Sequence, residues 1–493
     1  MLITRSVQHG TKNAHTEGSE GRRPRSYARK GLVPAALLGL LAGCGADADT
    51  PPVDASTVRD AGVADVVLTD PVDVLDPLPD GGPMDTSDGA ISVNRPELVP
   101  ATDERIATLK VPQGFELRVF ARNVEGARML AVGPDGSIYV TSPSMSQVWR
   151  LRDLDGDNDA DDPGERTVVA SLTDGADLAG VHGIAIAGTQ VYLASVKAVF
   201  SGSISNGQFV SLRAIVTDLP DGSQHPNRTL GIGPDQKLYV SVGSACNACA
   251  ESNSEHATML RVELDGAPTY NAANPAHPVV AHAPMAKLSP RIFASGLRNT
   301  LGFDWHPTTG ELWGSDHGSD GLGDDMPADE LNRISEGTSY GWPYCWGDGQ
   351  VDPVIDDPSR SVKKGDYCKS TAASRLDYPA HNAPIAFAFY RGSTFPADYV
   401  GDAFVAFRGS WNRSVASGYK VVRVHFENGV PQPRAGTTSA IEDFLTGFLI
   451  DNGHQFGRLA GLTVDAGGAL LVSDDSNGMI YRIAATPNRP RTR

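Results

Sequence analysis

The feature that most constrains the fold of this chain is a turn followed by a short β-rich run, which recurs after residue 105. In each copy a turn containing Pro, Asp or Gly precedes a run rich in Val, Leu, Ile and Tyr, a combination that signals a strand. The copies are irregularly spaced, about 45 to 95 residues apart. Six copies are present, at residues 133–140, 188–194, 233–240, 306–313, 401–406 and 465–472.

Several copies are followed by a further strand, at residues 147–151, 420–424 and 479–483. Six such units predict an all-β, six-bladed β-propeller over residues 105–485, each blade being a four-stranded antiparallel sheet. The extra length is expected in loops, above all in 314–384. A long β-sandwich or a solenoid is the alternative, but it fits 53 glycines punctuating short twisted strands less well.

A propeller gathers loops from all its blades at one end of a central channel. Residues far apart in the sequence therefore converge there. On this basis we expect His225, Arg298 and Arg408 to share one pocket.

Charge and hydropathy exclude two classes of function. The formal charge of −17 argues against nucleic-acid binding, which needs a basic footprint. No apolar run is long enough to span a bilayer, and the longest, residues 32–42, has the length of a signal-peptide core.

The N-terminus has the features of an export signal. Five basic residues between 22 and 30 precede that apolar run, which ends in Leu41-Ala-Gly-Cys44. This pattern resembles the bacterial lipobox, which implies that residues 1–43 are removed and that Cys44 is lipidated; an ordinary signal peptide is the alternative. Residues 45–90 contain eleven Asp, six Pro and one Arg, so we expect 44–100 to be a disordered tether that links the domain to a membrane.

The cysteines fit an exported chain. Apart from Cys44 they form two pairs, Cys246 with Cys249 and Cys345 with Cys368, and disulfides are the default in an oxidising compartment. For Cys246-Asn-Ala-Cys249 a redox-active pair and half of a zinc site remain alternatives. A c-type haem is excluded because no His follows Cys249.

Four motifs in the second half of the chain resemble one enzyme family. His225 lies in a loop before a Gly233-Pro-Asp turn and a strand, and Gly296-Leu-Arg-Asn299, Asp329-Glu-Leu-Asn332 and Ser339-Tyr-Gly-Trp-Pro343 follow. In this order they resemble the soluble quinoprotein sugar dehydrogenases, which use pyrroloquinoline quinone (PQQ) and calcium. The sorbosone (aldose) dehydrogenase branch is the most similar. The resemblance runs from about residue 112 to residue 483.

Oxidation of a sugar hydroxyl needs a base and a hydride acceptor, and because no side chain accepts hydride the acceptor must be a cofactor. A nicotinamide is disfavoured, since no Gly-x-Gly-x-x-Gly follows a strand. The resemblance implies that His225 is the base and that His182 is a second catalytic residue in the pocket. A turn histidine and a strand-start histidine are the structural alternatives. Gln224 stands where glucose-oxidising relatives carry an Asp that orients the base.

PQQ carries three carboxylates, so its site should supply fixed cations. The resemblance assigns Arg298 and Asn299 to the cofactor, while Pro379 stands where relatives stack a Trp on the quinone. The other residues implied for the cofactor are Arg391, Arg408, Arg413, His381 and Ala383, with Arg228 and Arg458 as further candidates.

Calcium is the expected metal because quinone and carboxylate oxygens are hard ligands. The resemblance implies that the backbone carbonyls of Gly318 and Ser319 hold one ion, and that Glu330 and Tyr340 hold a second, structural one. Separately, the acidic loop 153–162 places carboxylates at alternate positions and predicts a calcium site, although the terminal Glu of an EF-hand is absent at its usual spacing. Its ligands would be Asp153, Asp155 and Asp157; a solvated acidic turn is the alternative.

These features predict an exported, lipid-anchored PQQ- and calcium-dependent dehydrogenase that oxidises the C1 hydroxyl of an aldose. Its electrons would pass to a quinone or a cytochrome. Two alternatives keep the propeller: a calcium-dependent lactonase-like hydrolase, and a surface protein without catalytic activity that binds carbohydrates or proteins.

Overall fold

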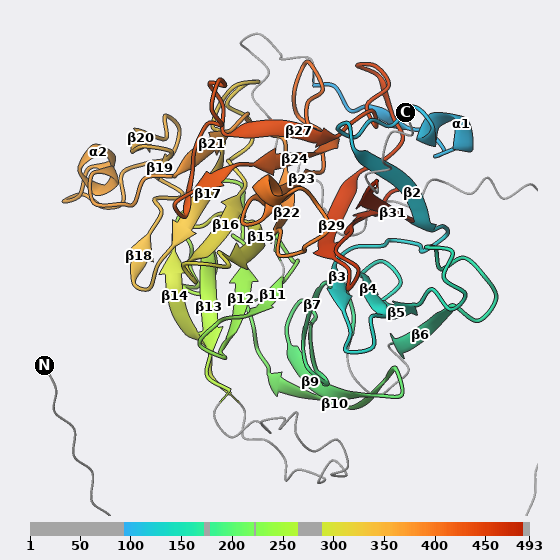
Figure 1. The fold of residues 1–493 in the computed structure, drawn as a ribbon. Coiled ribbons are helices and arrows are strands. Elements are labelled where there is room, and N and C mark those ends of the chain that lie inside the picture. Colours follow the sequence, from blue (N-terminus) through green and yellow to red (C-terminus); the bar gives the residue numbers. More distant parts are fainter. Residues whose placement is uncertain (1–92, 172–177, 221–222, 265–287, 487–493) are drawn as a thin grey trace, which may run out of the picture. The chain divides into compact units, whose positions relative to one another are not determined.

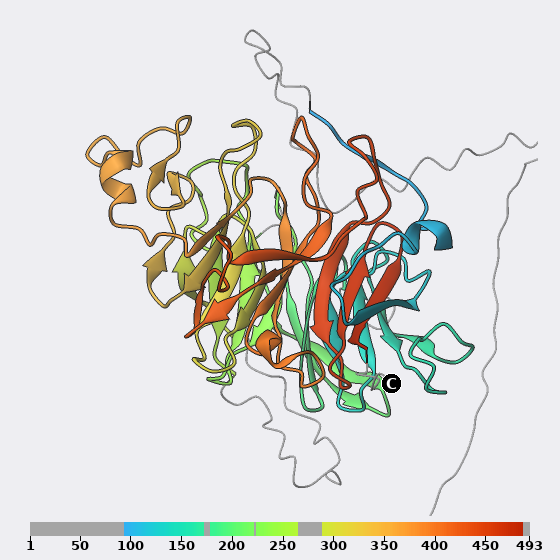
Figure 2. The ribbon, with the colours of Figure 1, turned by 45° about the horizontal axis from the view of Figure 1, so that its top comes forward.

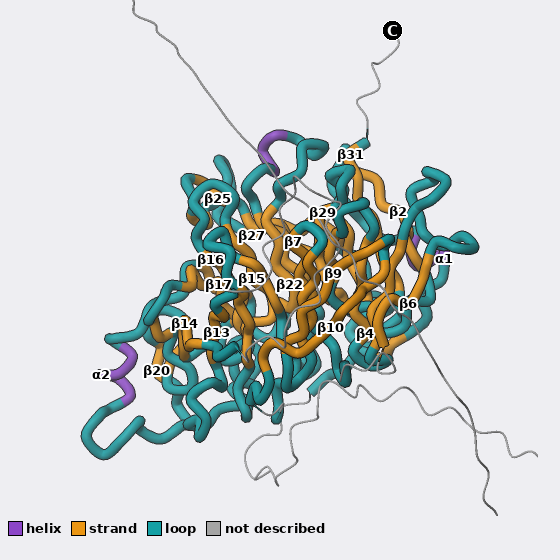
Figure 3. The backbone as a smooth tube through the Cα atoms, turned by 90° about the horizontal axis from the view of Figure 1, so that it is seen from below, coloured by secondary structure: helices purple, strands orange, loops and turns teal. Residues whose placement is uncertain are grey.

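Six antiparallel sheets surround a common centre in the part of the chain that the structure describes, five with four strands and one with five (Figure 1). This computed structural model describes residues 93–171, 178–220, 223–264 and 288–486. All of them belong to one compact unit. The predicted all-β, six-bladed β-propeller is therefore confirmed. Seen from below, the strands occupy the middle of the domain and the loops lie around them (Figure 3).

Each blade is one sheet whose strands follow one another in the sequence, from the innermost outward. Blades 1, 2 and 3 comprise β3 (Leu130–Val132), β4 (Ile138–Ser142), β5 (Gln147–Leu151) and β6 (Arg166–Ser171); β7 (Gly183–Ala187), β8 (Gln190–Ala194), β9 (Val199–Ser205) and β10 (Gln208–Val216); and β11 (Leu230–Ile232), β12 (Leu238–Val242), β13 (Thr258–Val262), β14 (Arg291–Ser295) and β18 (Thr338–Ser339). Blades 4, 5 and 6 comprise β15 (Thr300–Trp305), β16 (Leu312–Asp316), β17 (Asp329–Ile334) and β21 (Leu376–Tyr378); β22 (Pro384–Phe389), β23 (Ala403–Phe407), β24 (Lys420–Val424) and β27 (Ile441–Leu445); and β29 (Leu459–Val464), β30 (Leu470–Asp474), β31 (Met479–Ala485) and β2 (Phe115–Ala121).

The recurring turn of the sequence is the connection between the first and second strand of each blade. In blade 1, Asp135 Oδ1 accepts the Ser137 N–H at 3.1 Å, and Gly136 adopts a φ of 81°. Blade 3 repeats this turn with Gln236 in the left-handed position, at a φ of 62°. Asp side chains that bond the backbone two residues on stabilise such turns, which is why the motif marks all six hairpins.

The second strand of each blade forms the centre of the core. All residues of β4, β12, β16, β23 and β30 are buried. Strands covered on both faces carry near-continuous apolar runs. In blade 5 the buried ring of Phe404 packs against Phe444, with ring centroids 4.5 Å apart.

The ring of blades is closed by the two ends of the domain. Strand β2 pairs antiparallel with β31, with Phe115 opposite Ala485, so the first and last strands of the propeller share blade 6. Figure 1 shows β2 in blue beside β31 in red. Closure in this way removes an exposed edge from blade 6.

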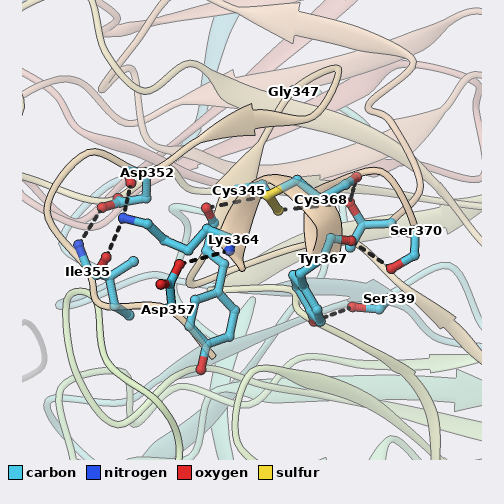
Figure 4. The surroundings of a disulfide bond; sticks show 12 residues. Ser339, Cys345, Gly347, Asp352, Ile355, Asp357, Lys364, Tyr367, Cys368 and Ser370 are labelled. Carbon is cyan, nitrogen blue, oxygen red and sulfur yellow. Dashed lines mark hydrogen bonds between the residues drawn. A yellow bond between two sulfur atoms is a disulfide. The ribbon is translucent and has the colours of Figure 1, made fainter. Parts of the chain in front are cut away.

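The long insertion predicted in 314–384 lies mainly between β17 and β21. It contains α2 (Lys364–Cys368) and a hairpin of β19 (Cys345–Trp346) and β20 (Gln350–Val351). The predicted disulfides Cys345–Cys368 and Cys246–Cys249 are both confirmed. Figure 4 shows Cys345–Cys368 beside Lys364, whose amine donates to the Asp352 carbonyl at 2.7 Å.

The chain before the propeller is in place from Val93 onward. There β1 (Glu97–Leu98) pairs in parallel with β28 (His454–Gln455), and Arg95 lies 5.0 Å from the centre of the Trp411 ring. Figure 2 shows this blue segment leading into α1 (Asp103–Ile106). The disordered tether predicted up to residue 100 therefore ends by residue 93, while residues 1–92, including Cys44, lie outside the described part.

Two small elements complete the inventory, a hairpin of β25 (Phe426–Glu427) and β26 (Val430–Pro431) and the 3-10 helix η2 (Ala397–Tyr399). Within the described ranges, no helix is long and apolar enough to cross a bilayer.

Candidate functional site

The innermost strands of all six blades begin at the same mouth of the propeller, so the residues just before them form a ring around the axis. Neighbours in this ring touch: the His182 ring contacts both the Arg128 side chain and the Arg228 carbonyl, at 3.2 Å each. The residues one or two positions before these strands are Arg128, His182, Arg228, Arg298, Ala383 and Arg458. Five of them carry a basic side chain, which makes this mouth the candidate active site.

Buried carboxylates at the ends of second strands hold two of these approaches in place. Asp316, the last residue of β16, accepts the N–H groups of Arg298 and Asn299 at 2.8 Å each. Asp474, the last residue of β30, accepts the Arg458 N–H at 2.9 Å. Burial raises the pKa of Asp316 to about 6 and that of Asp474 to about 7.

Arginines from three blades surround Asp475. Arg408, at the end of β23, donates to both carboxylate oxygens at 3.2 and 3.3 Å, and Arg128 donates to Oδ2. Burial alone would raise the pKa of Asp475, but the charges of Arg408, Arg128 and Arg458 outweigh it and lower the pKa. A cluster in which arginines outnumber carboxylates is suited to an anionic ligand.

His182 is fully buried beneath this cluster. Its Nδ1–H donates to the Arg228 carbonyl and its Nε2 accepts from Arg128 Nε, each at 3.2 Å. Because these contacts occupy both ring nitrogens, the predicted catalytic role of His182 is corrected: it positions Arg128.

His225 is partly exposed and its ring is fixed by Ser244. Nδ1 lies 2.9 Å from both the carbonyl and the hydroxyl oxygen of Ser244, and that hydroxyl donates its own proton to the Cys246 carbonyl at 2.7 Å. A carbonyl only accepts, so Nδ1 carries the proton and Nε2 carries the lone pair of the neutral ring. Ser244 thus does the orienting that the sequence could not assign to Gln224.

Gly243 allows His225 and Asn299 to approach each other. A Cβ on Gly243 would lie 2.4 Å from the His225 Cβ and 2.8 Å from Asn299 Oδ1, so any larger residue would push them apart. The predicted base and the predicted cofactor residue are therefore neighbours. Asn299 Nδ2 also lies 3.4 Å from His317 Nδ1.

Arg298 points its guanidinium at two loops. Nε and Nη2 donate to the carbonyl and side-chain oxygen of Asn247, at 2.9 Å each, and Nη2 lies 3.1 Å from Asp320 Oδ2. Among the described residues none accepts a hydrogen bond from Nη1. One edge of this buried guanidinium therefore remains for a ligand.

The predicted calcium carbonyls lie on the loop next to Arg298. No donor in the described part of the chain reaches the carbonyl oxygens of Gly318 and Ser319. Asp329 holds this loop: Oδ1 accepts the Gly318 N–H at 2.9 Å and Oδ2 accepts the Ala383 N–H at 3.1 Å. Burial raises the pKa of Asp329 to about 7. Two adjacent carbonyls without donors fit a hard cation.

Glu330 lines a cavity of about 20 Å³ together with Asp316, Tyr340 and Asp352, which is room for one water or ion. Burial, followed by the charge of Asp316, raises the pKa of Glu330 to about 8. The Tyr340 hydroxyl already donates to the Arg333 carbonyl at 2.5 Å and accepts from Ser335. The residues fit the predicted structural calcium if Tyr340 contributes its carbonyl.

Replacing Glu330 by Gln is expected to remove both a pH dependence and a calcium dependence of stability. A carboxyl whose folded pKa is raised stabilises the fold fully below its unfolded pKa of 4.5 and loses that contribution as pH rises through about 8. Without metal, the wild-type melting temperature should therefore fall between these values, and calcium at 100 times its Kd should restore on the order of 5 °C. Glu330→Gln should flatten both responses, and exposed Glu427→Gln should keep them. An unchanged calcium response in Glu330→Gln would exclude Glu330 as a ligand.

The loop residues His381 and Arg413 bind other loops. His381 Nε2 donates to the carbonyls of Gly323 and Met326, at 2.9 and 3.0 Å. Arg413 donates to the carbonyls of Asp324, Ala380 and Val415. Neither side chain is directed to the arginine cluster in this arrangement, so their predicted cofactor contacts are corrected to positioning of the rim.

Arg391 belongs to the opposite mouth of the propeller. It follows β22, whose other end adjoins Ala383, and forms a bidentate ion pair with Asp304 at 2.7 and 2.8 Å. Both residues line a separate cavity of about 520 Å³. The prediction of Arg391 as a cofactor residue is therefore wrong: it preceded knowledge of which way this strand runs.

The acidic loop lies between β5 and β6. Asp153, Asp155 and Glu165 place one oxygen each within 4.8 Å of one another, as do Asp155, Asp157 and Asp162. Glu165 is 3% exposed and lies one residue beyond the EF-hand spacing. A buried carboxylate thus faces the loop where none was expected from the spacing, and calcium binding here remains a prediction.

Removing the two leading carboxylates of this loop is expected to reduce the number of bound calcium ions by one. Asp153→Asn combined with Asp155→Asn leaves shape unchanged but removes two charged ligands. Isothermal titration of the metal-free protein measures the stoichiometry. The exposed substitution Asp348→Asn is the control, and an unchanged stoichiometry in the double variant would show that the loop is a solvated turn.

Sequence reasoning missed several residues of this mouth, namely Arg128, Asp475, Asn247, Asp320 and Asp329. Arg128 and Asp475 are 347 residues apart and meet only because blades 1 and 6 are neighbours in the closed ring. The available signal was positional: Arg128 precedes the first strand of its blade as Arg298 does.

Comparison with known proteins agrees with this site. The TrAA12-like family matches residues 109–486. A PQQ-dependent sugar dehydrogenase of Hypocrea jecorina is 25% identical over 405 residues, 75% of this chain and 87% of that protein. A protein of Borreliella burgdorferi is 29% identical, over 78% and 92% of the two chains.

The fold agrees as well. A calcium structure of the Trichoderma reesei protein of carbohydrate-active enzyme family AA12 superimposes with a TM-score of 0.61 at 21% identity, over 81% of this chain and all of that one. The resemblance to PQQ-dependent sugar dehydrogenases is confirmed, and the chain belongs to the TrAA12-like family.

Proposed function

We propose that this protein is a PQQ- and calcium-dependent dehydrogenase that oxidises the C1 hydroxyl of an aldose-type sugar to the lactone. The observation that carries the proposal is the composition of one mouth of the propeller. A histidine of fixed tautomer, buried arginines and two carbonyls without donors lie there on adjoining loops.

His225 is the base. Nε2 holds the lone pair, while Nδ1–H is anchored by Ser244, so the ring can take the hydroxyl proton without turning. The Ser244 carbonyl also stabilises the positive charge that the ring then acquires, although less strongly than a carboxylate would.

Bound PQQ supplies the hydride acceptor. Arg128 and Arg408, which already bind Asp475, would hold its carboxylates on the side of blades 1 and 5. Arg298 would hold it on the side of blade 4 through Nη1, next to Asn299. Calcium on the carbonyls of Gly318 and Ser319 would polarise oxygens bound beside it.

The protein's partners follow from the sequence. Removal of residues 1–43 and lipidation of Cys44 would place the domain at a membrane surface on the outer side of the cell. A membrane quinone or a cytochrome would then accept the electrons. The sorbosone branch remains the proposed substrate subtype, because the motifs quoted above resemble it.

The test is a titration of the purified, calcium-loaded protein with PQQ, followed by a panel of aldoses with a dye as electron acceptor. Stoichiometric binding and sugar-dependent reduction of the dye would support the proposal. Absence of PQQ binding would overturn it and favour the hydrolase or the non-catalytic propeller.

A further inference from the structure

The loop between β12 and β13 contains the disulfide Cys246–Cys249, which the proposed function does not use. Its four residues lie partly buried beside the candidate site, and the disulfide closes a ring only three positions long in sequence. So short a closed loop leaves the residue inside it little conformational freedom. That residue is Asn247.

Asn247 uses its side chain and its backbone to connect two other loops. Its carbonyl and Oδ1 accept from Nε and Nη2 of Arg298 at 2.9 Å each. Oδ1 also accepts the Asp320 N–H at 2.7 Å, and Nδ2 donates to the Asp320 carbonyl at 2.9 Å. Both ends of the amide are therefore engaged, and their orientation is defined by partners that can only donate or only accept.

These contacts fix one side of Arg298 and leave its Nη1 edge available. Asp320 directly follows Gly318 and Ser319, so the same amide also fixes the end of the carbonyl loop. On the other side of the disulfide, the Cys246 carbonyl accepts from the Ser244 hydroxyl that faces His225. One short loop thus supports the base, the cofactor arginine and the carbonyl pair.

We propose that Asn247 is a positioning residue for PQQ binding, acting through Arg298 and Asp320. The inference rests on the proposed function, since it concerns the same site. Without the amide, Arg298 can rotate its Nη1 edge away and the 318–320 loop loses an anchor. Residues that orient direct ligands typically contribute about 10- to 100-fold to binding or activity.

The test measures the Kd of PQQ for the calcium-loaded protein by titration, without turnover. Asn247→Ala is expected to raise this Kd by about 10- to 100-fold. Asn247→Ser, which keeps a small polar side chain but cannot span Arg298 and Asp320, should behave alike if the alanine variant folds poorly. Asn253→Ala is the matched control, an exposed Asn of the same loop, and should bind like the wild type.

A double-mutant cycle with Arg298→Ala distinguishes positioning from general destabilisation. If Asn247 acts through Arg298, Asn247→Ala should change the Kd little once Arg298 is gone. An equal loss in both backgrounds, or a wild-type Kd in Asn247→Ala, would overturn the inference. Failure of the wild-type protein to bind PQQ would instead overturn the proposed function.

Discussion

His225→Ala is expected to lower kcat by about 10²- to 10⁴-fold while the Kd of PQQ stays within about twofold of the wild-type value. The ring of His225 is held through Nδ1 alone, so Nε2 is the atom that can receive the substrate proton. No hydrogen bond links this ring to Arg298, Arg128 or Arg408 in the described part of the chain, so cofactor affinity should not depend on it. Stopped-flow reduction of the PQQ-loaded protein by excess aldose measures the effect.

The matched control for this prediction is His454→Ala. That histidine is 47% exposed and pairs with Asp451 on an outer loop, so its removal should leave kcat unchanged. A His225→Ala variant that turns over at more than about a tenth of the wild-type rate would place the base elsewhere. A variant that also lost PQQ would make His225 a cofactor residue.

Arg298→Ala is expected to raise the Kd of PQQ by about 30-fold or more. Truncating one partner of a buried, hydrogen-bonded charge pair costs about 2 kcal/mol or more, and each 1.4 kcal/mol corresponds to about tenfold. Arg298 is 3% exposed, so water cannot replace its charge. Removing it also leaves Asp320 without its cation, which adds repulsion toward an anionic ligand. Quenching of protein fluorescence by PQQ gives the Kd directly.

Arg391→Ala supplies a closely matched control for this second prediction. Arg391 makes the same kind of bidentate ion pair, with Asp304, but at the opposite mouth of the propeller. It should bind PQQ like the wild type. Equal losses in the two variants would show that Arg298 acts through stability, and a loss confined to Arg391→Ala would reverse the assignment of the mouths.

The blade hairpins could be predicted because their signal is local. A turn of Asp and Gly followed by apolar residues specifies its own geometry through contacts within about five residues, so all six connections lie where the sequence indicated. The motif Gly296-Leu-Arg-Asn299 could be placed for a similar reason, since Asp316 caps it within its own blade. The disulfides also followed from composition and compartment.

The remaining part of the site depends on contacts that no local pattern encodes. Whether an arginine faces the site or the opposite mouth depends on strand direction, and this separates Arg408 from Arg391, which looked alike in sequence. Asp475 meets Arg128 only when β2 closes the ring against β31. The amino-acid order alone therefore specifies the blades and their turns, because those form over short distances. The closed ring selects which side chains share a pocket, because burial and ion pairing there join residues from opposite ends of the chain.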